Sequence, residues 1–155
     1  MAVLASVAIP CVHSPMAPQE AAQATAERLT RHLRLTRTLA VLHASDRPEG
    51  YALLFTGPLT DKYAEYVIVD RSTGQRLPSV GKVSTKVGRT QVTCTSTIRG
   101  VEFRFSNLGG VEILDQGGSK RSGDPVLEVR GGGLLYNIHV TEGTGHVELA
   151  TATTG

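Results

Sequence analysis

Two histidines near the C-terminus are the first residues whose spacing suggests chemistry. His139 and His146 flank a short glycine-containing turn, and Glu142 lies between them. In an antiparallel hairpin the two imidazoles would come within reach of one another, and imidazole and carboxylate groups are zinc ligands. Two histidines and one glutamate on a turn are few ligands for a metal, whereas turn histidines are common on surfaces. We therefore expect a surface hairpin here, with no metal and no cofactor.

Acidic side chains are the second candidates for chemistry. They alternate with apolar neighbours in short segments, which puts them on the solvent side of the strands that such segments predict. The residues are Glu102, Glu112, Asp115 and Glu128. The sequence contains no G-x-S-x-G, H-E-x-x-H, Walker A or G-x-G-x-x-G motif. We predict a chain that is not an enzyme, with no catalytic residue and no small-molecule substrate.

Charge and cysteine content weigh against several other functions. The chain has 16 Lys and Arg against 14 Asp and Glu, a net charge of +2, which does not call for a nucleic-acid partner. Basic residues are in excess between Lys62 and Arg99, but no aromatic residue is interleaved from Lys82 onward, so we expect a solvated surface there. Cys11 and Cys94 are too far apart for a CxxC motif or a metal knuckle. We favour two unpaired thiols, with a long-range disulfide as the alternative in an oxidising compartment.

The N-terminal segment MAVLASVAIPCV is an uncharged apolar run. A membrane-spanning helix needs about 20 apolar residues, so this run alone is too short, and it lacks the basic residues of a secretory signal. We interpret residues 1–17 as a truncated stalk, the second half of a longer hydrophobic helix, with an ordinary buried helix as the alternative. The residues expected to pack in a membrane or against identical helices are Val3, Leu4, Val7, Ile9 and Pro10.

A long helix is predicted over residues 20–44, which contain no Gly or Pro and are rich in Ala, Leu and Arg. Pro10, Pro15 and Pro18 precede it and predict a kinked or unwound connection. At 100° per residue the helix has a broad apolar face. The residues predicted to pack from this face onto a sheet are Leu29, Leu33, Leu35, Leu39 and Leu42. The opposite side, expected to face solvent or another subunit, holds Glu27, Thr30, Arg31, Arg34 and Arg37.

Short strands are predicted from Tyr51 onward, separated by glycine-rich turns. They cover residues 51–56, 64–70, 90–98, 101–105, 111–114, 126–130, 134–140 and 146–150. In VEFRF the apolar side chains point one way and the charged ones the other, which gives the sheet a dry face that the helix would cover. We predict one α+β domain over residues 18–155, with its antiparallel β region at residues 51–150.

The order of these elements resembles the type IV pilin-like proteins. LASVAIP looks like the second half of the pilin N-terminal helix, and LRLTRTLA is similar to the helix of the minor pseudopilin subfamily called GspH or FimU-like. VEFRFSNLGGVEI, PVLEVR and GLLYNIHVTEGTGHVEL resemble the late strands and glycine turn of that subfamily. The resemblance implies a helix that packs in the core of a filament and a β-rich head that faces outward.

Two features depart from the family pattern. The family's signature, a Gly cleavage site followed by Phe and an apolar run bearing a Glu, is absent, so Met1 is expected to be an internal residue of the helix. Pro15 and Pro18 also interrupt what is usually an unbroken helix.

The resemblance also implies a function. It implies a structural minor pilin or pseudopilin of a type II secretion or type IV pilus filament, with other pilin or pseudopilin subunits as partners. The N-terminal helix would hold the subunit in the bacterial inner membrane before assembly, and the head would lie in the periplasm or in an extracellular filament. The alternative is a secreted or surface-exposed β-rich binding module.

Overall fold

The computed structural model describes residues 16–56, 63, 65–86, 91–94 and 101–154, with only the backbone described at 91–94 and 151–153. The predicted stalk residues Val3, Leu4, Val7, Ile9 and Pro10 lie outside this part of the chain, as do Cys11 and the segment 95–98 of one predicted strand. The division of the chain at residue 17 therefore stays a prediction.

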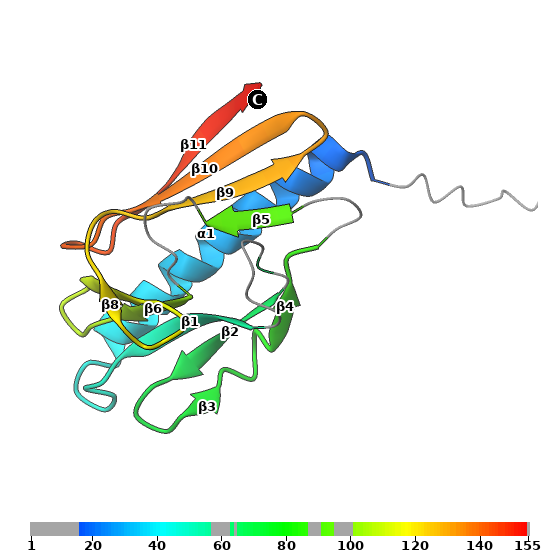
Figure 1. Ribbon diagram of the computed structural model, residues 1–155. Coiled ribbons are helices and arrows are strands. Elements are labelled where there is room, and N and C mark those ends of the chain that lie inside the picture. Colours follow the sequence, from blue (N-terminus) through cyan, green and yellow to red (C-terminus); the bar gives the residue numbers. More distant parts are fainter. Residues whose placement is uncertain (1–15, 57–62, 64, 87–90, 95–100, 155) are drawn as a thin grey trace, which may run out of the picture.

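One long helix packs against two antiparallel sheets (Figure 1). The helix is α1 (Pro18–Leu42). The first sheet, sheet A, has the strand order β3-β2-β1-β6-β7-β8, with β4 also paired to β2; the second, sheet B, has the order β11-β10-β9-β5. The strands of sheet A are β1 (Tyr51–Thr56), β2 (Glu65–Asp70), β3 (Gln75–Arg76), β4 (Lys82–Ser84), β6 (Glu102–Phe105), β7 (Val111–Leu114) and β8 (Lys120–Arg121). The strands of sheet B are β5 (Gln91–Cys94), β9 (Val126–Gly131), β10 (Leu134–Val140) and β11 (Val147–Thr154).

The strands form two sheets, whereas the sequence pattern predicts a single sheet. Alternation tells which side chains share a face of a strand, but it does not say which strands are neighbours. The short strands β3, β4 and β8 were missed because each has only two or three residues and none has an alternating pattern that includes a buried side chain.

The ends of α1 follow from local backbone chemistry. Pro18 is the first helical residue, where its missing N–H costs no hydrogen bond, so it starts the helix and does not kink it. The carbonyl of Ala17 accepts the N–H of Ala21 at 3.0 Å, which closes the first turn. At the other end the His43 N–H donates to the Leu39 carbonyl at 3.0 Å, and the chain then turns back through Gly50 into β1.

The buried face of α1 is shifted around the helix from the predicted one, toward Thr30 and away from Leu42. Leu29 and Leu33 are fully buried, and Leu35 and Leu39 are partly buried against the core. Leu42, expected on the same face, is 71% exposed, so that expectation is wrong. Its position is about 200° around the helix from the fully buried Ala40, and α1 ends there before any strand can cover it.

Directly opposed side chains fill the core face of each sheet. In sheet A, Leu53 of β1 lies opposite Ile68 of β2 and Phe103 of β6, and all three are fully buried. In sheet B, Ile138 of β10 lies between Leu127 of β9 and Leu149 of β11. These rows belong to a single core cluster that includes Leu29 and Leu33 of α1, so the helix is the common element of both sheets.

Candidate assembly surface on the helix

Three arginines of α1 bind backbone carbonyl groups of the two sheets. Arg28 donates from Nη2 to the Ser84 carbonyl of β4 in sheet A at 2.8 Å. Arg34 donates from Nε and Nη2 to the Val147 carbonyl of β11 in sheet B, at 3.1 and 2.9 Å. Such bonds from a charged donor are stronger than neutral ones and fix the orientation of the helix on the two sheets. Arg34 is exposed, as expected, and the structure also gives it a backbone partner.

Arg37 joins the turns at one end of the two sheets. Its Nε donates to the carbonyls of Thr144 at 3.1 Å and Gly109 at 3.3 Å. Thr144 belongs to the β10–β11 turn and Gly109 to the β6–β7 turn. The Val111 N–H also donates to the Glu142 carbonyl at 3.0 Å, so the two turns are bonded to each other as well as to the helix. Arg37 was also expected on the solvated face and is better described as a link between the sheets.

Close backbone approach explains the glycines in these turns. Gly145 has φ +62°, and a Cβ there would lie 2.0 Å from the Gly109 carbonyl oxygen. At the N-terminal end of α1, a Cβ at Gly132 in the β9–β10 turn would lie 2.8 Å from the Gln19 nitrogen. Gln19 in turn donates from Nε2 to the Gly132 carbonyl at 3.0 Å. Gly132 and Gly145 thus mark two places where a turn of sheet B approaches another backbone too closely for a Cβ atom.

A histidine and a tyrosine meet on the sheet A side of α1. His32 Nδ1 lies 2.7 Å from the Tyr66 hydroxyl of β2. Burial raises the pKa of Tyr66 to about 12, against the opposing effect of the nearby Arg28 charge. Burial lowers the pKa of His32, and the positive charges of Arg28 and Arg31 lower it further. Both effects favour the neutral forms, so this contact is a hydrogen bond between neutral groups at pH 7.

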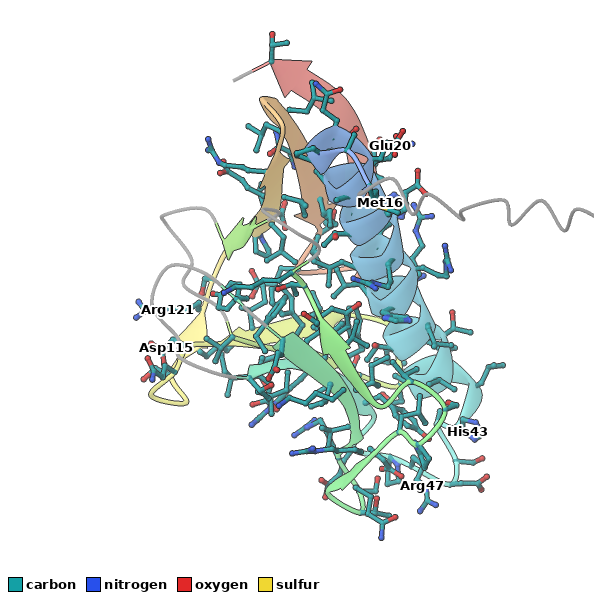
Figure 2. The ribbon with its side chains drawn as sticks, turned by 90° about the vertical axis from the view of Figure 1, so that its right-hand side faces the viewer. Met16, Glu20, His43, Arg47, Asp115 and Arg121 are labelled. Atoms are coloured by element: carbon teal, nitrogen blue, oxygen red, sulfur yellow. The ribbon has the colours of Figure 1, made fainter. Side chains whose placement is uncertain are left out.

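The remaining side of α1 is exposed along its whole length. Its exposed residues are spaced by three or four, as a single helix face requires. They include Glu20, Ala24, Glu27, Arg31, Arg34, Thr38 and Val41. Figure 2 shows the helix along one side of the molecule, with Met16 and Glu20 near one end and His43 and Arg47 near the other. Large apolar side chains mark both ends of the face, because Met16 is 55% exposed and Val41 45% exposed.

Two solved structures share this architecture at low sequence identity. Both are crystal structures of the type IV minor pilin FimU of Pseudomonas aeruginosa strain PAO1. One matches with a TM-score of 0.57 and 13% identity over 86% of this chain and 98% of that chain. The other matches with a TM-score of 0.61 and 12% identity over 88% and 96%. No protein-family model matches the sequence, and a search of curated proteins finds no match.

The chain has a pilin-like fold. The predicted fold class, an α+β head in which a long N-terminal helix packs on antiparallel β-structure, is confirmed. Within the described ranges no helix combines the length and apolar character needed to cross a membrane.

The histidines do not form a metal site in this pilin-like head. His139 lies opposite Glu148 in the β10–β11 pair, and His146 lies in the turn. Glu142, the third residue of that candidate site, accepts the Gly123 N–H on Oε2 at 2.8 Å. Across the described ranges, no three His, Cys, Asp or Glu side chains are grouped closely enough to hold a metal ion.

Each acidic residue proposed from the strand pattern lies beside a basic one. Glu102 binds Arg104 at 2.7 Å, and Glu128 binds Arg130 at 2.6 Å. Glu112 lies 3.5 Å from Lys120. These are contacts between neighbouring positions on the sheets, and they resemble ordinary surface ion pairs more than a pair of catalytic carboxylates.

Asp115 and Arg121 form a similar pair at 2.7 Å, on the side of the molecule away from the helix (Figure 2). The Ser119 N–H and the Arg121 guanidinium hold the pKa of the Asp115 carboxyl below its usual value. The same carboxylate accepts the Gly117 N–H at 2.9 Å, so its role is to shape the turn before β8.

The basic stretch between Lys62 and Arg99 is described only in part, and two of its described cations have local partners. Lys82 pairs with Glu65 at 2.7 Å, and Arg71 donates to the Glu49 carbonyl at 2.7 Å. Arg71 also lines a polar groove of about 520 Å³ together with Arg104, Glu112 and Lys120. Both signs of charge line this groove, so it does not present a basic surface.

The residues that sequence reasoning missed are the carbonyl-binding arginines and the glycines that they reach. A helix pattern shows that Arg34 and Arg37 are away from the central apolar stripe, but not that sheet carbonyls lie within their reach. The available signal was the pairing of two glycine-rich turns, at residues 109–110 and 143–145, with an arginine-rich helix.

Proposed function

We propose that this chain is a structural, minor-pilin-like subunit of a type II secretion or type IV pilus filament. In this proposal residues 1–17 belong to a hydrophobic stalk that sits in the inner membrane before assembly and in the filament core afterwards. The head, residues 18–155, lies in the periplasm or on the filament surface. The partners are other pilin or pseudopilin subunits, and the role requires no catalytic residue.

The observation that carries the proposal is the two-sided character of α1 within a pilin-like fold. One side holds Ala22, Ala26, Leu29 and Leu33, all fully buried against the sheets. The other side is exposed from Glu20 to Val41 and has no described strand over it. An exposed helix face that follows an apolar N-terminal segment in the sequence is what a subunit that packs through its helix requires, and this supports the proposal.

Site-specific photo-crosslinking in the source bacterium tests this proposal. A benzoylphenylalanine at Ala24, on the exposed face of α1, is expected to give adducts with other pilin-like subunits, and the adducts should disappear when those subunits are deleted. The same residue at Arg76, exposed on the edge strand β3 of sheet A, is the matched control and should give no such adduct. The chain should also appear in the inner-membrane fraction or in filaments sheared from the cells. Absence from both fractions, together with no adduct from Ala24, would show the proposal to be wrong.

The alternative, a monomeric binding module, has one observation in its favour. The groove of about 520 Å³ is concave and is lined by Arg71, Arg104, Glu112 and Glu142, which could hydrogen-bond a polar ligand. Tight binding of a glycan or peptide by the monomer, lost in Arg104→Gln, together with no helix-mediated adducts, would favour that alternative over the filament subunit.

A further inference from the structure

A second groove, of about 320 Å³, runs between α1 and the edge of sheet B. Its lining residues are Glu27, Thr30, Arg31 and Arg34 of α1 and Leu149 of β11. Thr30, expected on the solvated side, is only 4% exposed and forms part of the floor. The groove therefore has a helix on one wall and the outermost strand of a sheet on the other.

The strand wall offers unpaired backbone groups. β11 is the terminal strand of sheet B in the described part of the chain. The Thr141 N–H donates to the His146 carbonyl at 2.9 Å, so the backbone groups of His146 face β10. Because this orientation alternates along an antiparallel strand, the backbone groups of Val147 and Leu149 face away from β10. Arg34 binds the Val147 carbonyl from outside, as this alternation requires. Leu149 is the next residue with the same orientation, and its N–H and C=O face the groove.

The helix wall offers an unpaired positive charge. Arg31 is exposed and makes no hydrogen bond or ion pair with the described residues. Glu27, one turn earlier, accepts the Gln23 Nε2 on Oε1 at 2.9 Å and is not bonded to Arg31. With Arg34 alongside, the end of the groove near Val147 carries two guanidinium groups against the single carboxylate of Glu27.

We propose that this groove binds an extended strand of a partner protein, added to the edge of β11, with a carboxylate side chain facing Arg31. The alternating N–H and C=O groups of an open strand edge match another peptide backbone, which a nucleic acid or a sugar does not supply. The excess of positive charge selects an acidic residue at that position of the incoming strand. This inference does not depend on the proposed filament role, since either a filament subunit or a monomeric module could use such an edge.

Titration of the ¹⁵N-labelled full chain, in mild detergent, with synthetic heptapeptides tests the proposal. The probe alternates Thr and Val with Glu at its centre, and two companions carry Lys at the centre or N-methyl groups on alternate amides. We expect the Glu peptide to shift the Leu149 amide resonance in a saturable way. The Lys peptide should bind about tenfold more weakly, and the N-methylated peptide should not bind, because it cannot complete the backbone ladder.

Charge reversal supplies the matched variants. Arg31→Glu should invert the preference, so that the Lys peptide binds more tightly than the Glu peptide. Arg76→Glu makes the same charge change on the exposed strand β3 and should leave the original preference intact. Because both positions are exposed, neither variant should change the melting temperature appreciably.

Three results would overturn the proposal. One is equal binding of the N-methylated peptide, and another is an unchanged preference in Arg31→Glu. The third is a concentration-dependent dimer in sedimentation, with the Leu149 amide protected from exchange in the absence of peptide, since the occupant of the edge would then be a second copy of the chain. Loss of this binding would leave the helix-mediated adducts of the filament proposal unaffected, so the two failures are distinguishable.

Discussion

Sheet A and sheet B pack on the same helix through different kinds of contact. The core of sheet A contains packed aromatic rings. The ring centroids of Phe55 and Phe103 lie 6.0 Å apart in an edge-to-face arrangement, and the Phe55 ring stacks on Tyr63 with a centroid distance of 4.3 Å. The described core side chains of sheet B are mainly aliphatic, and side chains of α1 also bind its backbone carbonyls, Arg34 at Val147 and Gln19 at Gly132. We infer that sheet A depends on side-chain volume, whereas sheet B depends more on close backbone approach and on the arginines of the helix.

The largest expected effect comes from breaking the element that both sheets share. Leu33→Asp would place an unpaired carboxylate at a fully buried position and should cost more than about 4 kcal/mol of the free energy of unfolding. Leu42→Asp makes the same chemical change at a position that is 71% exposed and should cost less than about 0.5 kcal/mol. Thermal unfolding followed by circular dichroism measures both. Equal melting temperatures would mean that the helix does not pack as described.

A comparison of core truncations tests the difference between the sheets. Ile113 and Ile138 are both fully buried, one in each sheet, and the same truncation can be made at both. Ile113→Ala should cost about 4 kcal/mol, while Ile138→Ala should cost about 2–3 kcal/mol if sheet B depends less on side-chain volume. Urea unfolding of the two variants gives these values. An equal or larger cost for Ile138→Ala would show that sheet B also depends mainly on side-chain volume.

The sequence was sufficient to predict the long helix, the longer strands and the helix-on-sheet packing, because these follow from periodicity within one segment. The bounds of Tyr51–Thr56 and Val111–Leu114 match the prediction, because glycines next to each strand mark where it begins or ends. The division into two sheets could not be predicted, because it depends on which distant segments pair: β5 joins β9 and not β6, its neighbour along the described chain. The partners of Arg34 and Arg37 depend on the same long-range pairing, so a pattern within the helix could only assign them to solvent.

The free energy of unfolding should fall at alkaline pH because of Tyr66, which lies in β2 of sheet A. Its pKa of about 12 in the folded chain lies above the ordinary value of 10.0, so the unfolded chain loses this proton first. Stability should therefore fall as the pH rises from 10 to 12, by on the order of 2–3 kcal/mol. Tyr66→Phe lacks the phenol and should lose less stability over that interval, even if it is less stable at neutral pH. Urea unfolding of both proteins at a series of pH values measures the difference, and parallel curves would contradict the raised pKa.

The smallest effect concerns the joint between the two sheets. Arg37→Met keeps most of the aliphatic stem but removes the donor shared by the Gly109 and Thr144 carbonyls, and should cost about 1–2 kcal/mol. Arg31→Met removes an equal charge from the same helix without losing a described hydrogen bond, and should change stability by less than about 0.5 kcal/mol. Because the loss is local to the two turns, amide exchange at Val111 should accelerate in Arg37→Met more than exchange at Leu53 in the centre of sheet A. If both amides accelerated equally, Arg37 would contribute to global stability and not to the coupling of one sheet with the other.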